Sequence, residues 1–239
     1  MEKTKIVWME KKEYETLINF DMAASFLGCE RNLLTGDMAE DFREAADFLT
    51  ASLCPRYMFQ IIQLSRGQKE ELFGNFLSEK FFPKEKKLLL TGNSIREHLG
   101  REEIAAAGCL TLGEGVDLMI AQLEQESMLK AIFADALANA AVESLRARLE
   151  QDAARTFNRE FGWLFGIGYG DLPLSLQKDF LEAIGAKEIG ITATKKMILC
   201  PSKSVTGFLN LKKKDGAGCS GKCSICSERE RCHVFKSKD

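Results

Sequence analysis

The chain has 239 residues, 45% of them hydrophobic and 28% charged, which is enough to bury the core of one large domain. Its formal net charge of −2 provides no overall positive field, so we expect neither a nucleic-acid partner nor attraction to an anionic membrane. The N-terminus lacks the apolar core of a signal peptide, and no stretch approaches the roughly 20 apolar residues of a membrane span. The composition therefore predicts a cytoplasmic protein.

The first two thirds of the chain predict a mixture of helices and strands. Residues 11–34 have no clear periodicity. The first expected helix begins at Thr35-Gly36-Asp37, ends before Pro55, and carries an apolar stripe of Met38, Phe42, Ala45, Phe48, Leu49 and Leu53. Further strands are expected at 57–64, 87–91 and 103–112, and further helices at 93–99, 116–123 and 128–157. The last of these helices should turn inward Leu129, Ile132, Phe133, Ala136, Leu137 and Ala140.

After this helix the composition changes, because four glycines occur within nine positions. Residues 161–170 are expected to form a loop whose backbone can approach a ligand. A helix over 173–184 and short strands at 189–192, 196–199 and 204–211 complete the pattern. We therefore predict an α+β body over residues 1–211, with an antiparallel or mixed sheet and packed helices, followed by a small tail over residues 212–239.

The eight cysteines are distributed unevenly. Cys29, Cys54 and Cys109 lie among apolar residues, as small core side chains do. Four others stand close together in the tail, spaced Cys219-x3-Cys223-x2-Cys226-x5-Cys232. In a cytosolic chain such thiolates predict a metal centre, and we favour a [4Fe–4S] iron–sulfur cluster over structural zinc. Cys200 or His233 could replace one ligand, and an unligated tail is the alternative.

The spacing of Cys219, Cys223 and Cys226 also matches that of radical S-adenosylmethionine enzymes. In those enzymes the motif follows the first strand of a barrel and most of the chain comes after it. Here only thirteen residues follow Cys226, and Ile225 stands where an aromatic residue is usual. We reject this interpretation.

Five stretches of the body, in this order and spacing, carry a resemblance to a known family. They are Leu88–Ile95 (LLLTGNSI), Thr111–Asp117 (TLGEGVD), Asp135–Glu143 (DALANAAVE), Gly168–Gln177 (GYGDLPLSLQ) and Met197–Gly207 (MILCPSKSVTG). From about Tyr57 to Leu211 the chain resembles the activation, or reactivation, domain of cobalamin-dependent methionine synthase and its free-standing relatives.

The resemblance implies a function in cobalt chemistry. Cobalamin that has lost an electron stalls as Co(II), and the family restores it by reduction coupled to methylation from S-adenosylmethionine. The implied partners are a corrinoid-binding protein, or a methionine synthase lacking its own activation domain, which would supply the cobalamin, and a low-potential electron donor such as flavodoxin or ferredoxin. The expected protein is thus the activating component of a methyltransferase.

The resemblance also implies a methyl-donor site. Gly168 and Tyr169 match the family's glycine–tyrosine pair, Glu143 matches an acidic position, and the turn Ser204-Val205-Thr206 is expected to line the same cleft. The sequence departs from the family in two places. Leu164 and Ile167 stand where an arginine and a proline are usual, and the arginine binds the donor's carboxylate. Phe208-Leu209 stands where an aromatic–tyrosine pair is usual. No catalytic residue is assigned, and His98 is expected on a helix surface.

Two alternatives remain open from the sequence. One is a reductive activator of a corrinoid protein that no longer uses S-adenosylmethionine. The other is a non-enzymatic module that binds a corrinoid protein and whose tail is held together by zinc.

Overall fold

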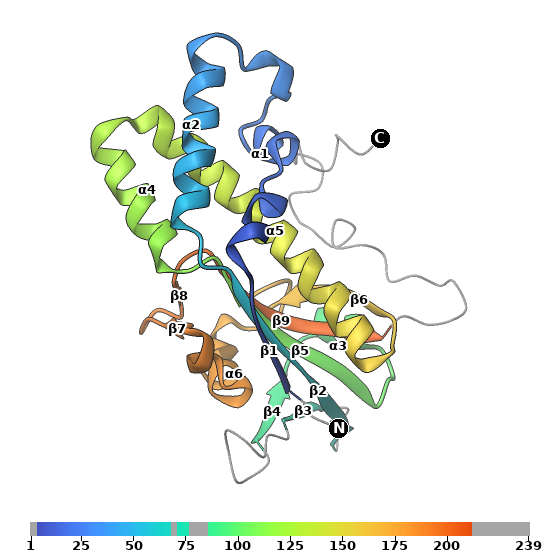
Figure 1. Ribbon diagram of the computed structural model, residues 1–239. Helices are drawn as coiled ribbons and strands as arrows, with labels where there is room; N and C mark the ends of the chain where they lie inside the picture. The colour runs from blue at the N-terminus through green and yellow to red at the C-terminus, as the bar shows by residue number, and fades with distance from the viewer. Residues whose placement is uncertain (1–3, 68–70, 77–85, 212–239) are drawn as a thin grey trace.

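The computed structural model describes residues 4–67, 71–76 and 86–211. Within these residues the chain forms a seven-stranded antiparallel sheet, a separate two-stranded hairpin and packed helices, which confirms the predicted α+β class (Figure 1). The strands are β1 (Thr4–Trp8), β2 (Arg56–Arg66), β3 (Leu72–Phe76), β4 (Lys86–Leu90), β5 (Ile104–Thr111), β6 (Phe161–Gly166), β7 (Thr192–Ala193), β8 (Leu199–Cys200) and β9 (Ser204–Leu211). The α-helices are α1 (Phe20–Phe26), α2 (Asp37–Ser52), α3 (Asn93–Leu99), α4 (Glu114–Glu126), α5 (Met128–Phe157) and α6 (Gln177–Ile184).

The main sheet runs in the order β4-β3-β2-β5-β9-β6. The long strand β2 pairs with β5 along one edge, and along its other edge it pairs first with β1 and then with β3. The last two strands, β9 and β6, come from distant parts of the chain and lie side by side. This pairing places the stretch Gly168–Gln177, which follows β6, beside the stretch Met197–Gly207, and the side chains of Gln177 and Thr206 form a hydrogen bond between the two.

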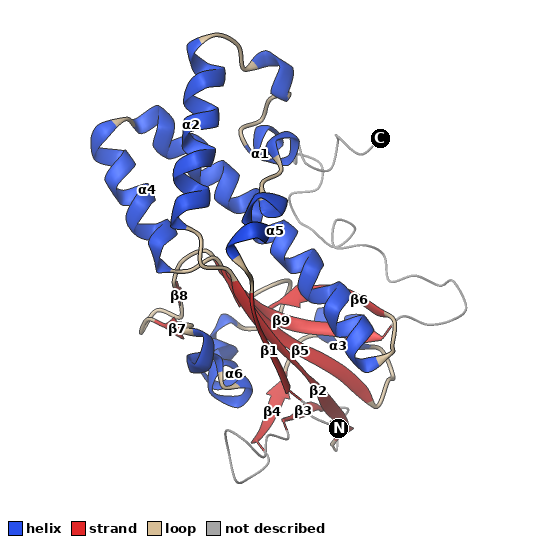
Figure 2. Cartoon of the chain, in the orientation of Figure 1, coloured by secondary structure: helices blue, strands red, loops and turns tan. Residues whose placement is uncertain are grey.

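Helices cover both faces of the sheet (Figure 2). Helix α5 crosses one face, and α1, α2 and α4 gather around its first half as a helical lobe. Helices α3 and α6 pack against the opposite face. Side chains alternate along each strand as a pleated sheet requires: Tyr57 and Phe59 of β2 enter the core under α5, whereas Met58 enters the core on the other side.

Helix α5 has the bounds that its sequence predicts and is the longest element, with 30 residues or about 45 Å. The hydroxyl of Ser127 accepts a hydrogen bond from the amide of Lys130 at 3.4 Å and caps its start. Asn158, at φ 50°, ends it in the left-handed conformation. Alanines on the buried side, including Ala134, Ala138 and Ala141, let α1 and α2 pack closely against it.

Several expectations from the sequence were wrong. Residues 161–166 form β6 instead of a loop, because they pair with β9. Four apolar side chains expected to face the core are 40–49% exposed: Met38, Phe48, Leu129 and Ile132. The sequence pattern did not predict β1 and β3. The strands expected at 189–192 and 196–199 are longer than the observed β7 and β8, and residues 186–189 form a 3-10 helix.

Two single residues also differ from expectation. His98 is 5% exposed rather than on the helix surface, because it packs under β6. Cys109 is buried as expected, whereas Cys54 is exposed.

Candidate functional site

The glycine–tyrosine loop, residues 167–171, follows β6 directly. Its first residue is held to β9, since the amide of Ile167 donates to the carbonyl oxygen of Thr206 at 3.2 Å. The amide of Tyr169 then donates back to the carbonyl oxygen of Gly166 at 3.1 Å, which closes a tight turn. Gly168 lies inside this turn at φ 89°, a conformation that favours glycine. The structure therefore brings Gly168 and Tyr169 next to Thr206.

The far end of the loop is fixed to α3. The carboxylate of Asp171 accepts hydrogen bonds from the amides of Asn93 at 2.6 Å and Ser94 at 2.9 Å. These backbone hydrogen bonds hold the pKa of Asp171 below its usual range. The sequence did not single out Asp171, although an acidic residue that meets the first amides of a helix is a familiar capping arrangement.

The ring of Tyr169 is half exposed and lies over Gly166. A Cβ atom added to Gly166 would meet this ring at 2.9 Å, so the ring occupies the space that a side chain would fill. Gly166 and Leu164 are two residues apart on one strand and share the face that α5 covers. Tyr169, at 50% exposure, therefore presents an aromatic surface at the end of β6, where its ring also lies 6.0 Å from that of Phe165.

The predicted Ser204-Val205-Thr206 segment is the start of β9. Ser204 and Val205 are half-buried, and the Ser204 hydroxyl donates to the carbonyl oxygen of Pro201 at 2.7 Å. Thr206 is buried, and its hydroxyl exchanges hydrogen bonds with the side-chain amide of Gln177 at 2.8 and 3.0 Å. Thr206 thus contributes its backbone to the loop, while its hydroxyl belongs to a buried pair that the sequence did not predict.

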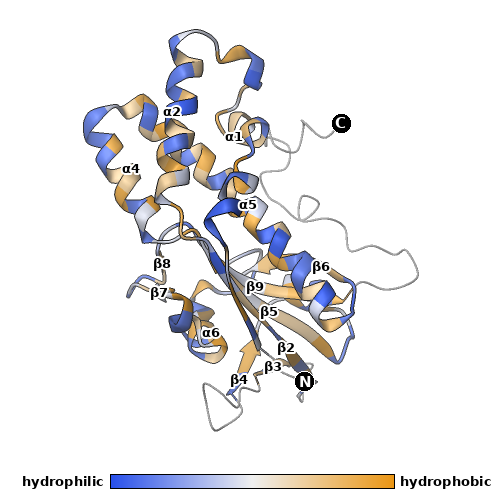
Figure 3. Cartoon of the chain, viewed as in Figure 1, coloured by the Kyte–Doolittle hydropathy of each residue, from blue (hydrophilic) through white to orange (hydrophobic). Residues whose placement is uncertain are grey.

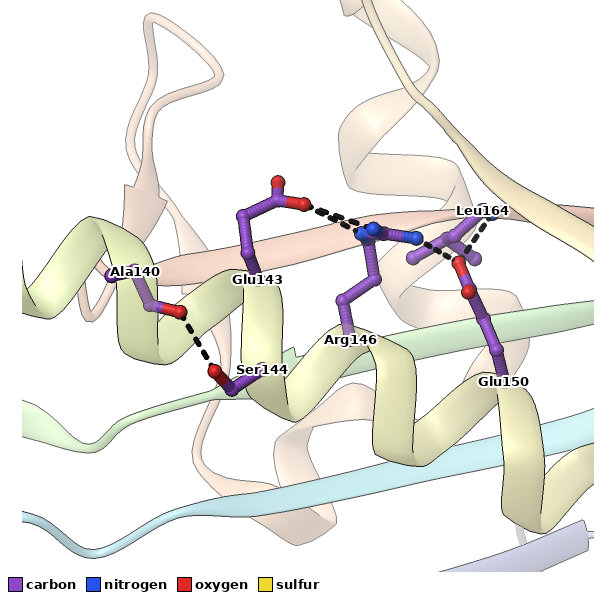
Figure 4. Close-up of polar contacts among 6 residues, drawn as sticks. All are labelled: Ala140, Glu143, Ser144, Arg146, Glu150 and Leu164. Carbon is purple, nitrogen blue, oxygen red and sulfur yellow. Dashed lines mark hydrogen bonds and ion pairs between the residues drawn. The ribbon is translucent and has the colours of Figure 1, made fainter. Parts of the chain in front are cut away.

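Glu143 belongs to a cluster of charges on α5 that faces β6 (Figure 4). One carboxylate oxygen of Glu143 accepts from the guanidinium of Arg146 at 2.9 and 3.1 Å. Arg146 also pairs with Glu150, and the same oxygen of Glu150 accepts from the amide of Leu164 at 2.9 Å. Burial acts to lower the pKa of Arg146, but the charges of Glu143 and Glu150 outweigh it, so the shift is upward. The i, i+3 and i, i+4 spacing of these residues could have indicated the cluster.

Leu164 occupies the position that is an arginine in the resembled family. Its side chain is 2% exposed and packs in the core under α5. The bond from its amide to Glu150 lies where the register of β6 shifts against β9, between residues 161 and 164. A guanidinium group does lie near Leu164, but it belongs to Arg146 on α5 and not to a residue of β6 (Figure 4).

The loop before β9 is anchored to two helices. The amide and hydroxyl of Ser202 donate to the carboxylate of Asp117 on α4 at 2.8 and 2.6 Å. The ammonium of Lys203 donates to Asp135 at 2.6 Å and to the side-chain oxygen of Asn139 at 2.7 Å, both on α5. These hydrogen bonds fix the position of Ser204, the first residue of β9, relative to α4 and α5.

His98 supports the site from the opposite face of the sheet. Its ring lies 4.8 Å from that of Trp163 and 5.1 Å from that of Phe165. Because the carbonyl oxygen of Phe208 can only accept, the 3.2 Å contact to Nε2 requires the proton on that nitrogen. Burial is the largest influence on the pKa of His98 and lowers it to about 4, so the ring is neutral at pH 7. Its role is structural.

No group of three or more potential metal ligands occurs among residues 4–67, 71–76 and 86–211. Cys219, Cys223, Cys226 and Cys232, and with them the predicted tail, lie outside the described residues. In the described part of the chain, no helix is both long enough and apolar enough to cross a membrane.

Fold and site together define an α+β domain in which a glycine–tyrosine loop and a charged helix meet at the edge strand of an antiparallel sheet. Its similarity to a solved structure is specific: the crystal structure of the MetH reactivation domain bound to AdoHcy, with a TM-score of 0.62 at 15% sequence identity. The similarity covers 98% of this chain and 88% of that one. No protein-family model matches the sequence, and no curated protein matches it either. The likeness establishes the fold.

Proposed function

We propose that the protein reactivates a corrinoid-dependent methyltransferase, with a methionine synthase lacking its own activation domain as the expected partner. The observation that supports this most is the fold similarity over 98% of the chain to the MetH reactivation domain bound to AdoHcy. The family motifs found in the sequence give independent support, because they meet at one place: β9 lies beside β6, and the glycine–tyrosine loop follows β6.

S-adenosylmethionine is the methyl donor in this proposal, and it would supply a sulfonium methyl group. The half-exposed ring of Tyr169 and the bare backbone at Gly168 offer an apolar surface for its adenosyl part. Arg146 and its two glutamates together carry a charge of −1, which suits the positive sulfonium and amino groups of the ligand. The uncharged side chain of Leu164 cannot bind the ligand's carboxylate, so we expect the affinity for S-adenosylmethionine to be weaker than in relatives with an arginine at this position.

The proposal assigns the cobalamin to the partner protein. The reactivating protein would hold the Co(II) form of that partner, and a low-potential donor such as flavodoxin or ferredoxin would supply the electron. The chain's own residues would then orient the methyl donor over the corrin and exclude water. Their contribution to the reaction would be the positioning of the two reactants.

We further propose that the tail holds a [4Fe–4S] cluster on Cys219, Cys223, Cys226 and Cys232. Support comes from the all-cysteine set and its spacing in the sequence, and from the need for low-potential electrons in the proposed reaction. Structural zinc is the alternative for the same ligands. The division into a body over residues 1–211 and a tail over residues 212–239 is part of this proposal.

A second candidate function is a reductive activator that does not bind S-adenosylmethionine. The burial of Leu164 in the core favours it, because that position provides no carboxylate partner. A purely binding module with a zinc-held tail is a third candidate, and it would show no reduction at all.

The three candidate functions can be distinguished by how the chain binds the partner protein. A reactivator must bind a corrinoid protein more tightly in the cob(II)alamin state than in the methylated state, because the stalled state is the one to be recognised. Titration of the full chain with cobalamin-loaded methionine synthase lacking its activation domain, prepared in each state, measures this preference. Equal affinity for the two states would exclude reactivation and leave the binding module.

A further inference from the structure

We propose that a groove in the helical lobe is a docking site for a basic amphipathic helix of a partner protein. The groove has a volume of about 320 Å³ and opens between α1, α4 and α5. Its apolar walls include Phe26 from α1, Ile120 from α4, and Met128 and Ile132 from α5. It lies along the first half of α5, from Met128 to Asn139, and the cluster around Arg146 begins one helical turn further along, at Glu143.

The side chains on the groove are unusually exposed for their size. Phe26 is 41% exposed, Met128 61% and Ile132 49%, although all three line one depression. Figure 3 shows hydrophobic positions on α1, α4 and α5 within this lobe. Single exposed apolar residues are normal on protein surfaces, but several that line one groove indicate a binding surface. A groove between packed helices is the usual receptor for the apolar stripe of another helix.

The charge around the groove indicates which kind of helix it accepts. Residues 10–53 contain ten acidic against four basic side chains, and residues 114–135 contain five against one. The whole chain has 35 acidic and 33 basic residues, so negative charge is concentrated in the segments that build the lobe. Exposed Glu124 and half-buried Asp135 lie in the groove lining itself. An acidic partner, or a second copy of this lobe, would be repelled.

The polar end of the groove already binds an ammonium group. Asp135 and Asn139 both line the groove, and both accept hydrogen bonds from Lys203, at 2.6 and 2.7 Å. Asp135 remains 49% exposed in this pair. Lysine or arginine side chains at the edge of a docked helix would meet the open side of Asp135 and the carboxylate of Glu124, while its apolar stripe covers Ile132.

The test uses two fluorescent 18-residue peptides with the same leucine stripe, one with lysine and one with glutamate at the polar positions. Fluorescence anisotropy with the full chain should show binding of the Leu/Lys peptide only. Ile132→Ser should weaken it about tenfold, because an apolar anchor is lost. Leu118→Ser is the matched control, since Leu118 is 70% exposed on α4 but does not line the groove, and it should change nothing. Glu124→Gln should weaken binding and reduce its dependence on salt.

Three results would overturn the proposal. The Leu/Glu peptide could bind as well as the Leu/Lys peptide, or Ile132→Ser and Leu118→Ser could have equal effects, which would mean nonspecific attraction. Sedimentation could instead reveal a dimer that Ile132→Ser dissociates, in which case a second copy covers the groove. None of these outcomes depends on corrinoid binding, so this proposal and the proposed function fail separately.

Discussion

The α-carbon of Gly207 lies so close to the backbone of Phe165 that a Cβ atom added to Gly207 would stand 2.2 Å from the carbonyl oxygen of Phe165. No real Cβ approaches a backbone atom so closely, and backbone cannot move aside as a flexible side chain can. This contact sets the separation of β6 and β9, and thereby the position of the glycine–tyrosine loop that follows β6.

Gly207→Ala should therefore destabilise the fold by about 2–4 kcal/mol, because β6 must shift away from β9. Gly108, which pairs with Gly207 on the other side, provides the control. A Cβ there would meet the end of the Leu149 side chain at 3.2 Å and would lie at an ordinary contact distance of 3.6 Å from the carbonyl oxygen of Met58, so Gly108→Ala should cost less. Urea unfolding of both variants measures the difference, and equal losses would mean that the Phe165 contact is unimportant.

Gly168→Val should abolish binding of S-adenosylmethionine, because a side chain at φ 89°, with its Cβ 3.2 Å from the Leu174 side chain, would displace the loop that we assign to the ligand. Strain alone cannot account for the result if a matched variant keeps binding. Gly100→Val is that match: Gly100 also has positive φ, at 61°, but a Cβ there meets nothing within 4 Å and lies away from the loop. Isothermal titration of wild type and both variants decides. Wild-type protein that fails to bind at millimolar ligand would favour the reductive activator.

The same site makes Leu164→Arg informative in a different way. Because Leu164 is buried under α5, the new guanidinium would enter the core beside Glu150 rather than the open cleft. We expect this variant to lose stability, by roughly 2–4 kcal/mol, without a gain in affinity for S-adenosylmethionine. Thermal unfolding and the same titration measure the two effects, and a stable variant with tighter binding would show that position 164 faces the ligand.

Stability should fall as the pH decreases from about 6.5 to about 4, in part through His98. The pKa of His98 is lowered to about 4 in the folded protein, mainly by burial, so the unfolded chain takes up the proton first. Between pH 7 and pH 5 this costs about 2 kcal/mol of unfolding free energy. His98→Phe removes the titration and should flatten this part of the pH profile by a similar amount, while losing stability at pH 7. An unchanged pH profile would mean that His98 is accessible to protons in the folded state.

Sequence periodicity was sufficient for most of the body and insufficient where pairing overrides it. Helix α5 and strand β9 have the predicted bounds, because long runs of apolar residues at helical or alternating spacing leave little choice. The glycines of β6 indicated a loop, yet pairing with β9 makes the segment a strand. His98 was placed on a surface because a seven-residue helix has no periodicity that reveals which face β6 will cover.

The candidate site follows the same pattern. The sequence motifs indicated Gly168, Tyr169 and Glu143 as candidate site residues, but not the residues that hold them in place. The cap by Asp171 and the pair of Gln177 with Thr206 join residues from different elements. The cluster of Arg146 with Glu143 and Glu150 lies within α5, and only the bond from Glu150 to the amide of Leu164 links it to β6. Only the three-dimensional arrangement reveals that a guanidinium reaches the neighbourhood of Leu164 from α5 instead of from β6.

Anaerobically purified full-length protein should be brown and contain iron and sulfide, if the tail holds a cluster. Cys223→Ser combined with Cys226→Ser should remove the colour and the iron. Cys54→Ser combined with Cys29→Ser, which changes two cysteines of the body that are not fully buried, should remove neither. A colourless protein with stoichiometric zinc would replace the cluster by a structural zinc site.

The central claim is tested most directly by reductive methylation of a stalled corrinoid protein. The full chain would be mixed under anaerobic conditions with methionine synthase lacking its activation domain and loaded with cob(II)alamin, together with a low-potential reductant and S-adenosylmethionine labelled in its methyl group. The account predicts that the cob(II)alamin absorption is replaced by that of methylcobalamin, that the label appears on the cobalt, and that omission of the protein prevents both. Unchanged cob(II)alamin in the complete mixture would contradict reactivation by methylation.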